Sequence, residues 1–189
     1  SPVFTNATLR DAVARFFQDK GTAESTYGPM KCWDVSEVTD MEGLFNERVD
    51  MSVTERTAQQ AFNEPIEFWV VDKVTNMKDM FRFCTKFRQR LQAWDPRRVT
   101  SMEGMFVQAV SFNQDLGWCL HSSVDLTAAF QGTMCESATP PCGVDTQGSG
   151  TGSGICPFPT PIPTPAPSIS PVPTVTPWPT GAPSLVPTP

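Results

Sequence analysis

A motif that begins with tryptophan and ends with phenylalanine recurs four times in this chain of 189 residues. The copies are Trp33–Phe45 (WDVSEVTDMEGLF), Trp69–Phe81 (WVVDKVTNMKDMF), Trp94–Phe106 (WDPRRVTSMEGMF) and a degenerate Trp118–Phe130 (WCLHSSVDLTAAF). A polar insertion at 47–57 accounts for the longer first interval. Self-similarity at such a period is typical of repeat architectures, in which no unit buries its apolar residues alone and stacked neighbours share one core.

The spacing of apolar residues inside each copy predicts a short helix. Met77, Met80, Phe81 and Cys84 follow the i, i+3, i+4, i+7 spacing of one helix face, and the same face recurs in the first and third copies. N-cap residue types precede these faces, at Asp40, Asn76, Ser101 and Asp125. The segments 66–69, 91–94 and 116–118 are short enough to be parallel strands. The sequence therefore predicts an α/β fold, a short leucine-rich-repeat-like solenoid of about four strand-plus-helix units.

The ends of such a stack need caps. Leu9, Ala12, Val13 and Phe16 predict an amphipathic helix with Thr5 or Asn6 as its N-cap. The predicted organisation is then a sequence of four parts: an N-terminal helical cap at 1–28, the repeat solenoid at 29–134, a cysteine-containing C-terminal cap and Gly/Ser linker at 135–156, and an extended Pro/Ser/Thr-rich tail at 157–189.

The cysteine content favours an oxidising compartment. None of the six cysteines is spaced as CxxC, and the only histidine is His121, so a zinc site has almost no ligands. An even number fits disulfides, with 15 possible pairings, while six reduced core cysteines are the alternative. The disulfide candidates are Cys32, Cys84, Cys119, Cys135, Cys142 and Cys156, of which Cys135 and Cys142 are expected to tie the C-terminal cap.

The tail has a composition of its own. Residues 157–189 contain 13 of the 19 prolines and no charged residue, which favours polyproline II. A spacing of three aligns an apolar stripe that would dock against a neighbouring subunit, formed by Ile169, Val172, Val175 and Trp178. An unstructured stalk with accidental periodicity is the alternative. The O-glycosylation candidates are Thr160, Thr164, Ser168, Ser170, Thr174, Thr176, Thr180, Ser184 and Thr188. Asn6 begins an N-glycosylation sequon.

Several functional classes are disfavoured. The net charge of −6 argues against nucleic-acid binding, which needs a Lys/Arg surface. No apolar stretch is long enough to span a membrane, and no signal peptide begins the chain. Catalytic motifs are lacking, and the aspartates recur with the repeat as turn residues rather than as acid/base pairs. We therefore expect no catalytic, cofactor or metal site, and covalent glycans as the only attached groups.

The motif W-D-V-S-x-V-T-D/N-M-x-x-M/L-F, with Phe-x-x-x-Ile/Leu before each later tryptophan, resembles the BspA-like leucine-rich-repeat surface proteins. The resemblance covers about residues 9–144 and implies a secreted or surface-displayed solenoid associated with adhesion and with protein or matrix binding. The expected function is a secreted cell-surface structural glycoprotein, not an enzyme, that self-assembles through its tail into an extracellular fibril or coat. The partner would be another copy, in a homo-oligomer or filament. The alternative is an adhesin or protein-binding module displayed on a Pro/Thr stalk.

Overall fold

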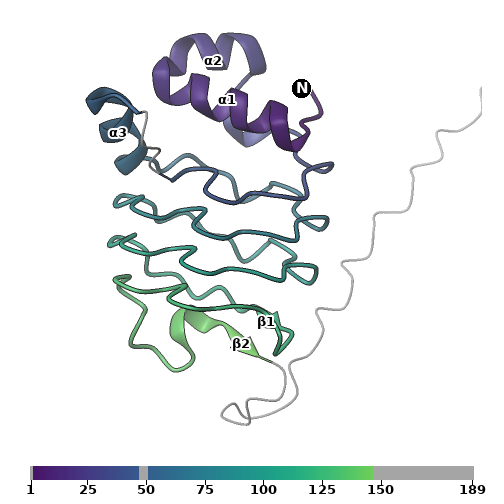
Figure 1. Cartoon of the computed structure of the whole chain (residues 1–189), viewed down its shortest axis with the longest axis vertical. Helices are drawn as coiled ribbons and strands as arrows, with labels where there is room; N and C mark the ends of the chain where they lie inside the picture. The colour runs from purple at the N-terminus through teal and green to yellow at the C-terminus, as the bar shows by residue number, and fades with distance from the viewer. Residues whose placement is uncertain (1, 47–50, 147–189) are drawn as a thin grey trace, which may run out of the picture. The chain divides into compact units, whose positions relative to one another are not determined.

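Two helices begin the chain in the computed structural model, which describes residues 2–46 and 51–146. Helix α1 (Asn6–Gln18) is followed by α2 (Lys20–Tyr27) (Figure 1). Thr5 is the N-cap of α1 and forms a capping box with Thr8, so the predicted helix and one of its two proposed caps are confirmed. The apolar face of α1 is buried, as its spacing predicts.

The remaining regular elements are short. They are η1 (Met30–Cys32), α3 (Val53–Gln60), β1 (Cys119–Leu120), η2 (Pro141–Gly143) and β2 (Asp145–Thr146). Strand β1 pairs in parallel with β2, with Cys119 opposite Asp145. Helix α3 lies largely within the insertion that the sequence predicts as a polar loop; Ser52 and Glu55 form a capping box at its start. The chain divides into two units, 1–158 and 159–189, and the second lies outside the described residues.

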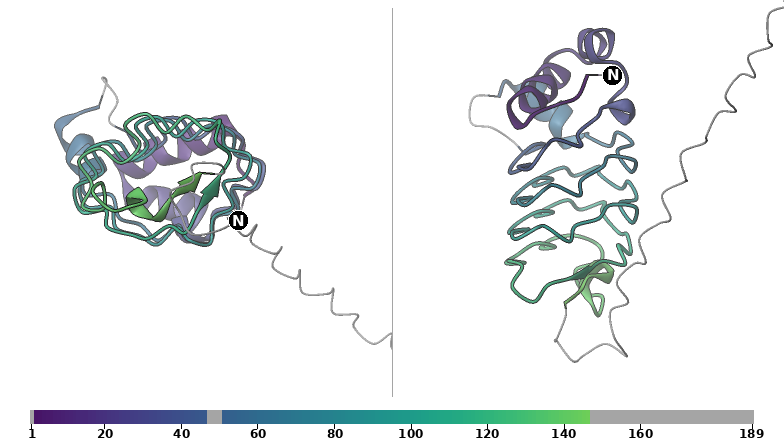
Figure 2. Two further views of the ribbon diagram at one scale, coloured as in Figure 1. Left: turned by 90° about the horizontal axis from the view of Figure 1, so that it is seen from below. Right: turned by 90° about the vertical axis from the view of Figure 1, so that its right-hand side faces the viewer.

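The four motif copies lie one above the other as layers (Figures 1 and 2). We call them layer 1 (33–45), layer 2 (69–81), layer 3 (94–106) and layer 4 (118–130). Isolated parallel bridges join Asp40 to Asn76, Asn76 to Ser101, and Ser101 to Asp125. Alternate backbone N–H groups of one layer donate to carbonyls of the next. In layer 2, for example, Met77 donates to Ser101 at 2.9 Å and Phe81 to Met105 at 2.8 Å.

The predicted α/β leucine-rich-repeat-like solenoid is wrong. Among the described residues, the three α-helices lie outside the motif copies, and the only paired strands are the two-residue β1 and β2. The segments 66–69, 91–94 and 116–118 are not strands, and the predicted helix faces after Asp40, Asn76 and Ser101 are turns and irregular chain. The described part of the chain is therefore helix at one end and mostly turn and loop elsewhere.

Backbone dihedral angles explain why no helix forms inside a layer. The second residue after the first methionine or leucine of each turn has a positive φ: Gly43 (56°), Asp79 (52°), Gly104 (62°) and Ala128 (54°). A right-handed helix requires consecutive right-handed residues, so one left-handed residue stops it after a single turn. The Met80 N–H, for example, bonds to the Met77 carbonyl at 3.2 Å, whereas the neighbouring Asp79 N–H reaches the Glu103 carbonyl of layer 3.

The residues predicted to be interior are nevertheless buried. All the methionines of the motif copies are fully buried, and every motif tryptophan is at most 4% exposed. The closing phenylalanines stack from layer to layer, with ring centroids 5.4 Å apart for Phe45 and Phe81 and 5.2 Å for Phe81 and Phe106. The indole N–H of each motif tryptophan donates to a carbonyl of the preceding part of the chain, as Trp94 does to Ile66 at 3.1 Å. The one polar atom of each large ring is thereby paired.

The cysteines divide into two classes. Cys135 and Cys142 form a disulfide, which confirms the predicted tie at the C-terminal cap, and Cys119 is also disulfide-bonded. Cys32 and Cys84 are free, so their prediction as disulfide partners is wrong for this structure. Cys84 is enclosed in the core, where its Sγ lies 3.4 Å from the Phe45 carbonyl oxygen. Cys156 lies outside the described residues.

Candidate functional site

The residues on either side of each buried tryptophan lie at the surface, and layer 2 differs there from the other layers. The position before the tryptophan is Cys32, Ala93 and Gly117 in layers 1, 3 and 4, and the position after it is Asp34, Asp95 and Cys119. Layer 2 instead carries Phe68 and Val70, and these side chains are 76% and 54% exposed. Layer 2 therefore exposes two large apolar side chains to solvent at positions where the other layers have small or polar residues.

The aspartates at the later position have a local structural role. Asp34 Oδ1 accepts the Ser36 N–H at 3.1 Å, and Asp95 Oδ1 accepts the Arg97 N–H at 3.2 Å. These bonds fix the turn two residues further on, which is a common use of aspartate. Val70 cannot make such a bond, and it is not part of the core. Neither turn geometry nor packing accounts for the exposed valine.

Two surface hollows adjoin these side chains. One, of about 240 Å³, is lined by Phe68, Val70, Asp72 and Asp95 among others. The second, of about 350 Å³, is lined by Asp72, Asp95, Arg97 and Arg98. Because Asp72 and Asp95 line both hollows, they connect into one surface that is apolar at layer 2 and charged towards layer 3.

Only some of the charged side chains on this surface form an ion pair. Arg97 holds Asp95 through Nε–Oδ1 and Nη2–Oδ2 contacts of 2.8 and 2.5 Å. Hydrogen bonding with Arg97 lowers the pKa of Asp95, and the same bond raises the pKa of Arg97, with a further contribution from Asp72. Asp72 and Arg98 form no hydrogen bond or ion pair with any residue that the structure describes. A partner could therefore engage one acidic and one basic group beside the apolar pair.

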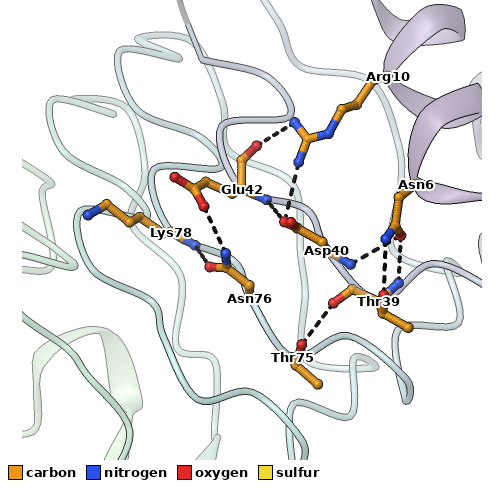
Figure 3. A network of polar contacts seen from close by, with 8 residues as sticks. All are labelled: Asn6, Arg10, Thr39, Asp40, Glu42, Thr75, Asn76 and Lys78. Carbon is orange, nitrogen blue, oxygen red and sulfur yellow. Dashed lines mark hydrogen bonds and ion pairs between the residues drawn. The ribbon is translucent and has the colours of Figure 1, made fainter.

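A second group of polar residues closes the edge of layer 1 under α1 (Figure 3). Asn6 Oδ1 accepts the N–H groups of Thr39 and Asp40 at 2.9 and 3.2 Å, and its Nδ2 donates to Thr39 Oγ1. Arg10, one helical turn further along α1, donates to the Glu42 carbonyl at 2.6 Å and to Asp40 Oδ1 at 3.3 Å. The N-glycosylation candidate Asn6 is thus held in a structural network, which the sequon alone did not indicate.

Other predicted functional features are not placed by the structure. The O-glycosylation candidates and the stripe of Ile169, Val172, Val175 and Trp178 lie outside the described residues. Across 2–46 and 51–146, no group of three or more His, Cys, Asp or Glu side chains could share a metal ion. No described helix has both the length and the apolar character of a membrane span.

Comparison with known proteins then places the chain in a family. A family model described as "Mycoplasma protein of unknown function, DUF285" matches residues 12–139. The chain belongs to the DUF285 family. The DUF285 match runs from α1 to the C-terminal cap and includes Phe68 and Val70. No curated protein and no solved structure matches the chain. The family description carries no function, so the resemblance to BspA-like surface proteins stays a hypothesis.

Phe68 and Val70 were missed by reasoning from the sequence of this DUF285 member, although a signal was present. Aligning the four copies on tryptophan shows both large apolar residues at positions that elsewhere hold Cys, Ala, Gly or Asp. What the four copies share is their core. Residues that depart from a repeat at the surface are the better indication of a binding site, because the shared fold does not require them.

Proposed function

We propose that the chain is a non-enzymatic, extracellular protein-binding module and that Phe68 and Val70 are its anchor residues. The observation that carries this proposal is the exposure of both side chains on either side of the buried Trp69. Single exposed apolar residues are common, but two large ones beside a surface hollow are typical of an interaction site. Aromatic anchors of this kind contribute most of the affinity in many interfaces.

The surroundings of the two anchors fit a protein partner. Trp69 lies beneath them and is stacked on Trp33 with centroids 6.4 Å apart, so the anchors stand on a packed base. A rigid base keeps low the entropy that binding costs. Asp72, Arg97 and Arg98 supply a charged rim, which in interfaces adds specificity and orientation more than affinity.

Secretion is part of this proposal, and the disulfides support it. Cys135 and Cys142 are bonded and Cys119 is bonded as well, a use of cysteine that is rare in reducing compartments. Assembly through the tail stays a separate prediction because the tail lies outside the described residues. A Trp178→Ala change tests it: polymers that form as readily as those of the parent chain would contradict tail docking.

The test of the anchor residues uses the chain's own third layer as a template. The double variant Phe68→Ala/Val70→Asp gives layer 2 the residues that layer 3 has at Ala93 and Asp95, so folding should be retained. The full chain is tested by surface plasmon resonance against purified fibronectin, laminin and collagen. Binding of the parent chain to one of them should weaken at least tenfold in the double variant, or by about 1.4 kcal/mol.

A matched control is available on α3. Val53 is 82% exposed, and Val53→Ala removes an apolar side chain of similar exposure away from the proposed face. This control should bind as the parent chain does. Unchanged binding by the double variant, or an equal loss in the control, would refute the assignment of the anchors.

A further inference from the structure

Among the residues that the structure describes, the C-terminal end of the stack is only partly closed. The segment after layer 4 folds back across it (Figure 2). Its contacts include Leu116 N–H to the Cys142 carbonyl at 2.9 Å and Asp145 N–H to the Trp118 carbonyl at 2.9 Å. Glu136 Oε2 accepts the Gly132 N–H at 2.9 Å. These contacts leave backbone N–H groups unpaired in one stretch of layer 4, from 126 to 130.

This stretch carries a row of three hydrogen-bond donors. In layer 3, the N–H groups of Met102, Gly104 and Phe106 donate to carbonyls of layer 4 at 2.8–2.9 Å. The equivalent donors of layer 4 are the N–H groups of Leu126, Ala128 and Phe130. They form no hydrogen bond with any described residue. An edge of unpaired backbone groups is a template for pairing with another chain.

This edge offers donors and no free acceptors in the same stretch. The carbonyls of Leu126, Ala128 and Phe130 already accept local N–H groups at 3.0–3.1 Å, and those of Thr127 and Ala129 accept donors from layer 3. An ordinary strand would bring N–H groups of its own to the edge, and these would lose water without gaining an acceptor. The best complement is therefore an extended segment that presents carbonyls alone.

Proline at every second position produces such a segment when the chain is drawn out along the edge as a strand, instead of the polyproline II helix of three residues per turn that its composition favours when it is free. In an extended chain, the N–H and the carbonyl of alternate residues face the same side, and proline has no N–H. Prolines that alternate would then present a row of carbonyls with the two-residue period of the donors. This chain contains that pattern at 157–167, with the sequence PFPTPIPTPAP.

Two exposed apolar side chains follow the closing phenylalanines of layers 3 and 4 in the sequence. Met134 and Val110 occupy the same position in successive layers, four residues after the closing phenylalanine, and they are 66% and 46% exposed. Pyrrolidine rings and the apolar residues between them could pack on this pair. Because α1 closes the opposite end of the stack, direct layer-on-layer stacking of two copies is blocked.

From these observations we infer that the edge at 126–130 binds residues 157–167 of a second copy of the chain. The incoming segment would add its proline carbonyls to the Leu126, Ala128 and Phe130 N–H groups and cover Met134. This contact is independent of Phe68 and Val70. It links copies head to tail, because each copy contributes one edge and one proline segment.

Amide hydrogen exchange of the ¹⁵N-labelled full chain tests the inference. A synthetic peptide with the sequence of residues 157–167 is added, and exchange is followed at the amides of Leu126, Ala128 and Phe130. At about 80% occupancy the three amides should exchange about fivefold more slowly, because each opens only when the peptide leaves. The Phe68→Ala/Val70→Asp variant should show the same protection, which separates this test from that of the proposed function.

A control peptide in which every proline is replaced by alanine should protect the three amides much less. A Met134→Ser variant, changed at an exposed side chain, should weaken the protection without changing stability. Without added peptide, protection of the three amides should increase with the concentration of the full chain. Unchanged exchange, equal protection by the alanine peptide, or protection that is complete at every concentration would overturn the inference.

Discussion

The side-chain oxygen Oδ1 of Asn6 accepts the backbone N–H of Thr39 at 2.9 Å. At the equivalent place in the later layers a backbone carbonyl accepts this bond, as that of Thr39 does from Thr75 and that of Thr75 from Thr100, both at 2.8 Å. Asn6 thus supplies from a helix the acceptor that a preceding layer would supply. Arg10 has the complementary role, because its guanidinium donates a hydrogen bond to the backbone carbonyl of Glu42.

Loss of the hydrogen bonds by which Asn6 closes the edge of layer 1 should destabilise the domain. Asn6→Ala leaves the Thr39 and Asp40 N–H groups without their acceptor, and we expect the free energy of unfolding to fall by about 1–2 kcal/mol. The measurement is urea unfolding of bacterially expressed protein, which carries no N-glycan. Asn6→Asp keeps the acceptor oxygen and should retain most of the stability. Equal stability of Asn6→Ala and the parent chain would show that the cap is dispensable.

Gly104 and Ala128 form a matched pair for the left-handed turn. Both have positive φ, 62° and 54°, at the same position of layers 3 and 4. Gly104→Ala should destabilise the fold by about 1–2 kcal/mol, because alanine disfavours the left-handed conformation. The added Cβ would also lie against the Asp79 carboxylate. Ala128→Gly removes that cost and should stabilise the fold by up to about 1 kcal/mol, after the entropy that glycine loses. Thermal unfolding measures both changes, and shifts of the same sign would contradict this account.

Acid sensitivity should arise in part from the turn aspartates. Hydrogen bonds from Thr127 hold the pKa of Asp125 below its ordinary value of 3.8, and those from Ser36 lower the pKa of Asp34 in the same way. Because the unfolded chain takes up these protons first as the pH falls, the stabilisation is complete above about pH 5 and is lost as the pH falls through the ordinary and then the lower folded pKa.

The double variant Asp34→Asn/Asp125→Asn should therefore lose less stability below pH 4 than the parent chain. At neutral pH it should remain close to the parent, because an asparagine Oδ1 can accept the same N–H group, as Asn76 does at the layer 2 equivalent of Asp125, where its Oδ1 accepts the Lys78 N–H at 3.0 Å. Urea unfolding at several pH values measures this difference. Parallel pH profiles of the two proteins would count against the carboxylates as its source.

The two free thiols should differ sharply in reactivity. Cys32 is exposed, whereas Cys84 is fully buried, and desolvation raises the pKa of its thiol. Since the thiolate is the reactive form, iodoacetamide should modify Cys32 in the folded protein and Cys84 only after unfolding. Mass spectrometry of the labelled peptides measures this, and Cys32→Ser is the control. Rapid labelling of Cys84 under native conditions would mean that the core opens or is packed differently.

The apolar pattern by itself determined which side chains are interior. Met77, Met80, Phe81 and Cys84 are all fully buried, as their spacing predicts. The same spacing predicted a helix that does not form, because the period of the apolar residues is also compatible with a left-handed residue at Asp79. Nothing local marks that aspartate as left-handed, whereas Gly43 and Gly104 at the same position give a hint.

The sequence alone determined which side chains are buried, because burial follows from the order of apolar residues along the chain. It also determined the repeat, the first helix and the disulfide at the C-terminal cap. Tertiary structure decided the backbone path, since the N–H groups that would close a helix instead meet carbonyls of the next layer, tens of residues away. The tertiary structure also decided which side chains and backbone groups remain exposed or unpaired at the surface. Phe68 and Val70 are exposed, and three donors of layer 4 have no acceptor within 2–46 and 51–146, only because of where the layers lie and where the stack ends.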